Sequence, residues 1–323
     1  MTIRTVRPKK LFLALMVATI SVLGVVQSAQ STTPGANGLI VYGQEVAPDH
    51  YQLFTIRPDG SSRRQVTRGA ASSLNADWAP SGRSLVYELD RSGTADTAGI
   101  AVATATGAKQ RILTPKGYQG QPSFSPDGKW IVFERDSSPT SNGIWLIRPN
   151  GSGLRQLTRN PYKTFEQCGC DTDPNFSPDG WWFTFVRIKK DEELQALFAV
   201  RPNGSGLHQI TPYSWQVAIK HDWSPDGKAI LLTTNADFVR PEQSANMVTI
   251  RPDGTGKTEV THFTGGQENA FAGSFSPDGK QIVFRLEEGD TYSLAVVDVS
   301  GENLEKLTTG KGKPRFIDWG THQ

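Results

Sequence analysis

The segment FSPDGKWIVFERD, Phe124–Asp136, constrains the fold more than any other feature, because close variants of it occur four more times in the chain. The other copies begin at Trp78, Phe176, Trp223 and Phe275, and their turn prolines lie 46 to 52 residues apart. A period in this range is typical of a repeat architecture in which each copy is one supersecondary unit.

Four of the five copies place an aromatic residue before Ser-Pro-Asp-Gly, the copy at Trp78 has Ala-Pro-Ser-Gly instead, and a short apolar run follows in every copy. Proline presets φ for the first central position of a tight turn, aspartate suits the second, and glycine accepts the left-handed conformation that closes a hairpin. A lone Asp-Gly lacks the alternating oxygen donors of a calcium loop, so we interpret these residues as structural. The predicted turn residues are Pro126, Asp127 and Gly128; Pro178, Asp179 and Gly180; Pro225, Asp226 and Gly227; and Pro277, Asp278 and Gly279.

A second repeat alternates with the first and occurs six times, for example as LFTIRPDGSSRRQVT and IWLIRPNGSGLRQLT. Each copy predicts an apolar strand, a glycine-containing turn and a short strand that ends at a threonine. One hairpin of each kind makes a four-stranded antiparallel unit of about 50 residues, the size of one propeller blade.

Six second hairpins face only five first hairpins, and the two ends of the chain supply the missing half. FIDWG, Phe316–Gly320, resembles the strand before a first turn, and GLIVYG, Gly38–Gly43, resembles the strand after one. Pairing them would close a ring and remove exposed sheet edges. We therefore predict an all-β, six-bladed β-propeller over residues 38–323, closed by N- and C-terminal strands that share one blade.

The first 28 residues resemble a secretory signal peptide, followed by a short linker at 29–37. Four basic residues precede an apolar stretch, Leu11–Val26, and small residues follow it. An uncleaved membrane anchor is the alternative, but this stretch is shorter than the ~20 residues that span a bilayer. We expect export with cleavage, hence a periplasmic or secreted bacterial protein with no transmembrane anchor after cleavage.

Without the leader the charge is nearly balanced. Removing its four basic residues from 34 leaves 30 basic against 32 acidic residues. A near-neutral domain gives no electrostatic footprint for nucleic acid, so we expect no nucleic-acid partner.

Cys168 and Cys170 are the only cysteines, within EQCGCDTDPNF. In an exported protein the pair can form a disulfide, and across a single glycine that ring would be small and strained. Free thiols, a metal site that adds Asp171 and Asp173, and a redox pair are the alternatives. We expect a local disulfide or free thiols and no metal or cofactor.

The blade topology divides the loops between two faces of the ring. The first and third turns of every blade emerge on one face, the hairpin-turn face, where they are short and uniform. The second turns and the connections between blades emerge on the opposite face, the variable-loop face, and are long and irregular. Loops on a rigid scaffold are the usual carriers of binding.

The variable loops are rich in aromatic residues suited to anchor an interface. We expect this face to bind a protein or peptide through Tyr118, Tyr162, Phe165, Tyr213, Trp215, His221, Phe263 and Phe271, with Phe238 in the same set. Any of these side chains can instead fold inward to cap the ring. Asp77, Asp222 and Asp318 share one repeat position, where they either line the channel or tie neighbouring blades together by hydrogen bonds.

No catalytic motif accompanies these repeats. The sequence contains no G-x-S-x-G, Walker A loop, dinucleotide fingerprint or H-E-x-x-H. His50, His221 and His262 fall on the predicted variable-loop face, and a three-histidine metal site there remains an alternative. The motifs favour a non-catalytic protein without excluding an enzyme.

The pairing of FSPDGKWIVFERD with IWLIRPNGSGLRQLT resembles the WD-repeat-like units of the TolB family over about Gly38–Gln323. The resemblance implies a periplasmic six-bladed propeller that acts as a docking module of the cell envelope. The chain departs from that family because about ten residues separate the leader from the first strand, leaving no room for the N-terminal α/β domain.

Two functions follow from these observations. We expect a monomeric, exported, non-catalytic scaffold that binds a protein or peptide of the cell envelope. Similar repeats occur in oligogalacturonate lyases, so the alternative is a carbohydrate- or metal-dependent enzyme of that type.

Overall fold

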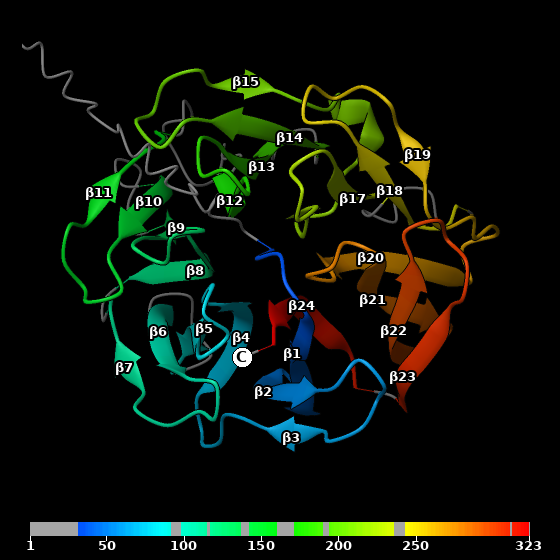
Figure 1. Ribbon diagram of the computed structural model, residues 1–323, viewed down its shortest axis with the longest axis horizontal. Coiled ribbons are helices and arrows are strands. Elements are labelled where there is room, and N and C mark those ends of the chain that lie inside the picture. Colours follow the sequence, from blue (N-terminus) through cyan, green and yellow to red (C-terminus); the bar gives the residue numbers. More distant parts are fainter. Residues whose placement is uncertain are drawn as a thin grey trace, which may run out of the picture.

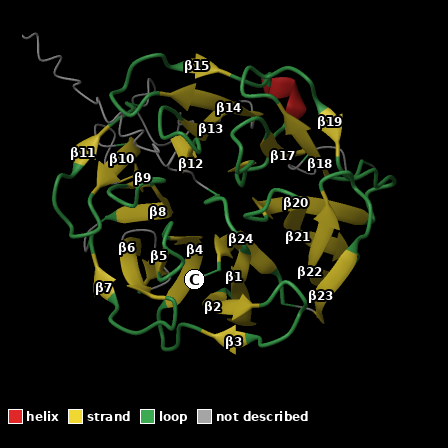
Figure 2. Cartoon of the chain, in the orientation of Figure 1, coloured by secondary structure: helices red, strands yellow, loops and turns green. Residues whose placement is uncertain are grey.

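The computed structural model describes residues 32–91, 98–114, 117–136, 142–159, 171–189, 194–235, 243–310 and 312–322. Within them the chain forms six four-stranded antiparallel sheets arranged in a ring around a central axis, which we call the channel (Figure 1). The described structure is almost all strand and loop, with one turn of 3-10 helix at η4 (Tyr213–Trp215) (Figure 2). The predicted all-β, six-bladed propeller is confirmed.

Each blade has one strand beside the channel and three more that follow it outward. The closing blade contains, in that order, β24 (Pro314–Thr321), β1 (Asn37–Ala47), β2 (His50–Ile56) and β3 (Arg64–Gln65). The next two blades contain β4 (Ser72–Trp78), β5 (Ser84–Asp90), β6 (Ala98–Thr104) and β7 (Arg111–Ile112), then β8 (Tyr118–Phe124), β9 (Ile131–Asp136), β10 (Gly143–Ile147) and β11 (Arg155–Gln156). The last three contain β12 (Asp171–Phe176), β13 (Phe183–Lys189), β14 (Leu194–Val200) and β15 (His208–Gln209); β16 (Asp222–Trp223), β17 (Ile230–Thr234), β18 (Asn246–Ile250) and β19 (Thr258–Glu259); and β20 (Glu268–Phe275), β21 (Gln281–Glu288), β22 (Thr291–Asp298) and β23 (Glu305–Gly310).

The ring closes where the sequence predicts, because β24 pairs antiparallel with β1. Ile40 lies opposite Trp319 in this register, and both side chains are buried. The backbone N–H of Trp78 in the next blade donates to Asp318 Oδ2 at 2.8 Å. The last strand of the chain therefore joins the first blade to its neighbour as well as completing it.

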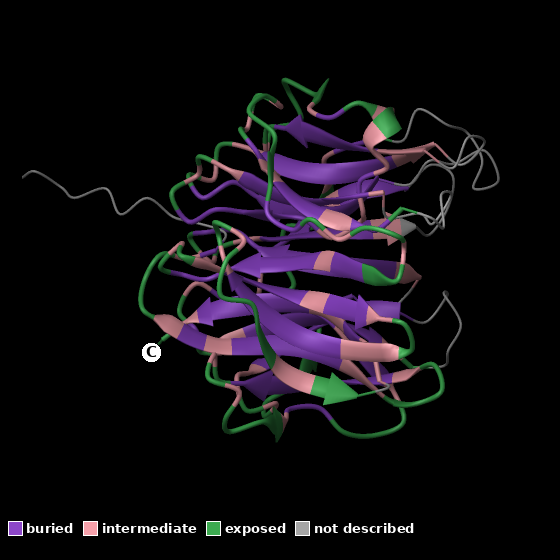
Figure 3. Cartoon of the chain, turned by 90° about the vertical axis from the view of Figure 1, so that its right-hand side faces the viewer, coloured by how far each residue is buried: buried purple, intermediate pink, exposed green. Residues whose placement is uncertain are grey.

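The core consists of apolar layers between adjacent blades. The second strand of a blade is buried at consecutive positions, as in β9 at Ile131, Val132 and Phe133. Both faces of the sheet are therefore covered. This pattern is typical of strands packed between neighbouring sheets, as the sequence predicts. Side by side, the blades appear as a stack of mostly buried sheets with exposed loops at both ends (Figure 3).

The repeated first turns have one geometry. The Ser125 carbonyl accepts a hydrogen bond from the Gly128 N–H at 2.8 Å, and Gly128 has a φ of +66°. Asp127 Oδ1 accepts from the backbone N–H of Lys129 at 3.0 Å, so the aspartate side chain closes the turn a second time. The turns that contain Asp179, Asp226 and Asp278 repeat these bonds.

Glycines of the third turns differ in how closely the neighbouring blade approaches, and this difference makes a prediction. Gly301 has a φ of +88°, and a Cβ there would lie 2.3 Å from the Val260 carbonyl oxygen. Gly151 has a φ of +87° and nothing within 4 Å of such a Cβ. We expect G151A to lose about 1 kcal/mol of unfolding free energy from left-handed strain alone, and G301A to lose a further 1 to 3 kcal/mol, roughly the cost of overpacking. Denaturant unfolding measures both, and equal losses would contradict the blade contact.

Candidate functional site

An irregularity recurs on four of the innermost strands, three residues before the aromatic residue of the repeat. Asn75, Gln121, Asp173 and Phe316 occupy this position with φ between +46° and +51°. The pairing with the second strand of the blade shifts register beside each of them. Such bulges bend a strand and redirect a side chain. Together with Lys220, at the same repeat position, these residues line a narrow cavity of about 10 Å³ inside the channel.

Aspartates one residue before the aromatic tie neighbouring blades together. Asp77 Oδ2 accepts from the Phe124 N–H at 2.7 Å, and Asp222 Oδ2 accepts from the Phe275 N–H at 2.8 Å. Asp318 makes the equivalent bond across the closure. The blade-tying role of these aspartates is confirmed, and Asp77 also lines the narrow cavity.

Lys220 is the cation at the centre of this acidic ring. Burial by itself lowers the pKa of Lys220, but the carboxylates of Asp173, Asp222, Asp318 and Asp77 outweigh it and leave the pKa raised. Burial also raises the pKa of Asp222 to about 6, against the opposing effect of Lys220. Lys220 is therefore charged and already compensated by the channel aspartates.

The channel mouth is the end of the channel on the variable-loop face. The second-strand residues near it differ in charge from blade to blade. The position after the central aromatic is Glu88 in β5 and Glu134 in β9, whereas it is Arg285 in β21. Asn75 Nδ2 donates to Glu88 Oε2 at 2.5 Å, and Thr172 Oγ1 donates to Glu134 Oε2 at 2.5 Å. One side of the mouth is thus acidic and hydrogen-bonded, and the opposite side is basic.

Glu88 gives the protein a testable pH dependence. Burial raises the pKa of Glu88 from 4.5 to about 7. Because the folded state holds this proton more tightly, the contribution of Glu88 to the free energy of unfolding is largest below pH 4.5 and falls by about 3 kcal/mol as the pH rises through 7. E88Q keeps an acceptor for Asn75 and removes the titration. We expect the difference in unfolding free energy, wild type minus E88Q, to fall between pH 4.5 and 7. A difference that does not change with pH would show that the pKa of Glu88 is not raised by burial.

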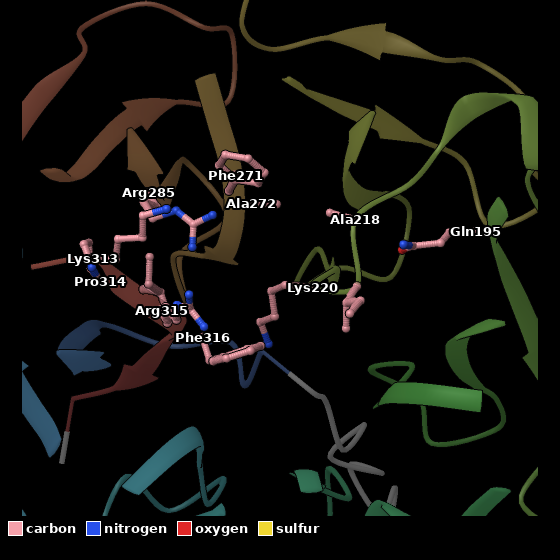
Figure 4. Close-up of a pocket in the computed structure, with 12 residues that line it drawn as sticks. Gln195, Ala218, Lys220, Phe271, Ala272, Arg285, Lys313, Pro314, Arg315 and Phe316 are labelled. Carbon is pink, nitrogen blue, oxygen red and sulfur yellow. The ribbon is translucent and has the colours of Figure 1, made fainter. Parts of the chain in front are cut away.

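A pocket of about 260 Å³ opens at the basic side of the channel mouth, and we call it the mouth pocket (Figure 4). Arg285, Lys313 and Arg315 line one side of it, and Phe271 and Phe316 provide aromatic walls. Lys220 and Phe316 line both this pocket and the narrow acidic cavity. They therefore form the boundary between the basic mouth and the acidic channel.

The mouth pocket is held by β20, β21 and β24. The guanidinium carbon of Arg285 lies 4.2 Å from the centroid of the Phe271 ring, which faces Arg285 across the β20–β21 ladder. Arg315 lies over Tyr51 and Lys313 over Tyr292 at 5.1 and 4.6 Å. Each cation is thus positioned by an aromatic face from a regular strand.

The aromatic residues predicted from the loops occupy several environments. Tyr213 and Trp215, in η4, pack with half-buried rings against two different cores and lie under Lys189 and Lys257. Phe263 packs against the β20–β22 core, and half-buried Tyr118 begins β8. Phe271 is the predicted aromatic that lines the mouth pocket. Tyr162, Phe165 and Phe238 lie outside the described residues.

His221 is fully buried beneath the loops. Its Nε2 lies 2.8 Å from Thr184 Oγ1, and its Nδ1 lies 3.2 Å from Asp173 Oδ2. A partner on the surface cannot touch this side chain in the structure. His50 contacts the Gly69 carbonyl and His262 pairs with Glu259 instead.

The described part of the chain contains no group of three or more His, Cys, Asp or Glu side chains placed to hold a metal ion. Cys168 and Cys170 lie outside it, so their oxidation state stays a prediction. None of the helices among the described residues is long and apolar enough to cross a membrane.

Sequence reasoning missed Lys220, Arg285, Lys313 and Arg315, and it treated Phe316 only as part of a strand. A position-by-position alignment of the repeats carries a signal for two of them. Lys220 falls where other blades have Asn75 or Gln121, and Arg285 falls where others have Glu88 or Glu134. No repeat signal marks Lys313 or Arg315, because they lie before the part of β24 that matches the repeat.

The sequence matches the TolB beta propeller domain family over residues 41–323. An uncharacterised protein of Agrobacterium fabrum is 29% identical over 219 residues, covering 66% of this chain and 65% of the relative. The Tol-Pal system protein TolB of Francisella tularensis subsp. mediasiatica is 27% identical over 265 residues, covering 80% of this chain and 56% of the relative. The chain thus spans only part of the length of these relatives.

The fold has a close counterpart among solved structures. TolB from Acinetobacter baumannii superposes with a TM-score of 0.70 over 90% of this chain and 68% of that chain, at 20% sequence identity. At this identity the likeness shows the fold alone.

Proposed function

We propose that this chain, which belongs to the TolB beta propeller domain family, is an exported scaffold that docks a protein or peptide on its variable-loop face. The observation that carries the proposal is the mouth pocket, where aromatic and cationic side chains converge at the end of the channel on that face. Aromatic and arginine side chains are the residues most often found at the energetic centre of protein interfaces.

The scaffold suits docking because it holds the pocket rigidly. The walls come from strands β20, β21 and β24 rather than from loops alone. The channel below narrows to a cavity of about 10 Å³, so a partner is held at the mouth rather than threaded through the ring. Preorganised walls reduce the entropic cost of binding.

The proposed location is the periplasm or the exterior of a bacterial cell, and the proposed partner is a protein of the cell envelope. The basic, then apolar, then small-residue leader supports export. Relatives named for the Tol-Pal system support an envelope partner. We propose that the protein acts as a monomer, without cofactor or nucleic acid.

The enzymatic alternative has a direct test in metal content. A manganese- or zinc-dependent lyase would carry stoichiometric metal, and replacing His221 and His262 would remove it. We expect the purified protein to contain no stoichiometric manganese or zinc. Stoichiometric metal that both replacements abolish would favour the enzyme.

Affinity capture from the cell envelope tests the docking proposal. We expect the tagged protein to retain a specific partner, and W215A and F271A to lose it. W181A is the matched control, because Trp181 is 70% exposed and follows a first turn on the hairpin-turn face. Thermal unfolding of each variant separates loss of binding from loss of fold. If W215A and F271A retain the partner and W181A loses it, the interface lies on the hairpin-turn face, and the proposal is wrong.

A further inference from the structure

The mouth pocket has more positive charge than its surroundings neutralise. Among the described residues, Arg285 and Lys313 share one close carboxylate, Glu287, whose Oε1 lies 2.9 Å from Arg285 Nε and 3.8 Å from Lys313 Nζ. Within the described chain, neither of these ion pairs involves Arg315. Lys220 is compensated separately by the channel aspartates. The three cations and one carboxylate therefore leave the pocket with a net positive charge.

Two buried donors in this pocket lack hydrogen-bond acceptors. Arg315 Nε is buried and has no hydrogen-bond partner among the described residues. Arg285 Nε is close to Glu287, but the contact is not aligned as a hydrogen bond, and the Arg285 side chain is only 18% exposed. A buried donor without an acceptor lowers the stability of the protein, and the cost is larger when the donor belongs to a charged group such as a guanidinium. Burial lowers the pKa of Arg285; Glu287 opposes this and Arg315 adds to it.

Aromatic rings hold two of these cations in place, and this contact is compatible with pairing to a carboxylate. A guanidinium lying over an aromatic face keeps its in-plane N–H groups available to a carboxylate in the same plane. Arg285 lies over Phe271 and Arg315 lies over Tyr51, so an aromatic ring holds each of the two side chains in place. Figure 4 shows Arg285, Arg315 and Lys313 together on one side of the pocket.

The shape of the channel limits what this charge can attract. The pocket of about 260 Å³ is smaller than ~300 Å³, the lower end for sites that enclose a drug-sized molecule, and it suits one or two side chains. Below it, past Lys220 and Phe316, the channel narrows to a cavity of about 10 Å³, so a larger group stops at the mouth.

The geometry points to an acidic peptide segment of the docked partner as the ligand of the mouth pocket, with its carboxylates paired to Arg285, Arg315 and Lys313. This inference rests on the proposed docking function and names the chemistry of the partner. Charge complementarity at the centre of an interface chiefly sets which partner binds and how fast. The aromatic walls, Phe271 and Phe316, pack against the apolar stems of the same segment.

A titration with defined peptides tests this inference without the native partner. The probe is a short N-acetylated, C-amidated peptide of alternating aspartate and glutamate, and its asparagine and glutamine counterpart is the neutral reference. We expect the purified protein to bind the acidic peptide, more weakly as salt rises, and not the neutral one. R285Q and R315Q should each weaken binding about tenfold, the size expected for one lost charge-assisted hydrogen bond.

Two further variants keep the test independent of folding. Lys313 is 33% exposed, so K313Q should fold normally and still weaken binding. R64Q is the control, because Arg64 is exposed on the outermost strand β3. Equal binding of both peptides, no binding, or unchanged binding in all three pocket variants would overturn the inference. Displacement of the peptide by inorganic phosphate at lower concentration would also overturn it, in favour of a small-anion site.

Failure of this inference differs from failure of the docking proposal. If envelope capture yields a partner whose binding is unchanged in R285Q, R315Q and K313Q, docking stands and the acidic segment is wrong. If the acidic peptide binds but W215A and F271A still capture the same proteins as wild type, the pocket stands and the docking surface is wrong.

Discussion

A chain that lacks residues 314–323 is expected to lose at least about 5 kcal/mol of unfolding free energy, because the deletion removes the innermost strand of the closing blade. Ile317 and Trp319 are buried in the core that β24 shares with β1 and β22. The hydrogen bond from the Trp78 N–H to Asp318 is lost as well. The deletion also leaves β1 as an exposed sheet edge, and such an edge invites aggregation.

Denaturant unfolding and size-exclusion chromatography measure the two consequences of this deletion. We expect a lower unfolding midpoint and a fraction of the protein in soluble oligomers. A truncated chain that unfolds at the wild-type midpoint and stays monomeric would show that the ring does not depend on closure by β24.

Trp319→Ala is the point substitution with the largest expected effect on stability. Trp319 is 1% exposed and packs against the second strands of two blades. Truncating a fully buried tryptophan costs about 3 to 5 kcal/mol, from the lost burial and the cavity left behind. Trp181→Ala is the matched control: Trp181 is 70% exposed, and surface substitutions usually stay within about 0.5 kcal/mol. Similar losses of unfolding free energy in the two variants would contradict the burial of Trp319 between the blades.

The fold could be predicted from the sequence because its information is local and repeated. The residues of each Ser-Pro-Asp-Gly turn determine its conformation locally, and the turn at Gly128 has the left-handed φ that glycine allows. Repetition then fixes the number of blades, and the leftover halves at the two ends fix the closure between β1 and β24. The one long-range pairing that the prediction needed, between β1 and β24, follows from the repeat pattern itself.

The site was harder to predict because its residues depart from the repeat. Phe271 was named because the sequence assigned it to a variable loop, whereas the structure places it within strand β20, where it lines the mouth pocket. His221 looked equally accessible, but the chain before β16 places it under the loops, hydrogen-bonded to Thr184. Whether an aromatic side chain folds inward depends on packing between blades, which a sequence pattern does not record.

Arg285 and Arg315 show the same limit for charged residues. Each looks like an ordinary surface cation in the sequence. They meet because β21 and β24 belong to adjacent blades, whose facing strands both contribute to the lining of the mouth pocket. The sequence predicted both strands, but not that their basic residues share a pocket.

Site-specific photocrosslinking in living cells tests docking on the variable-loop face most directly. A photoreactive phenylalanine analogue is placed at Phe271, in the mouth pocket, and in a second strain at Trp181, on the hairpin-turn face. We expect a discrete crosslinked protein from position 271 that is absent from position 181. The same crosslinked protein from position 181 alone would contradict this expectation and place the interface on the opposite face of the ring.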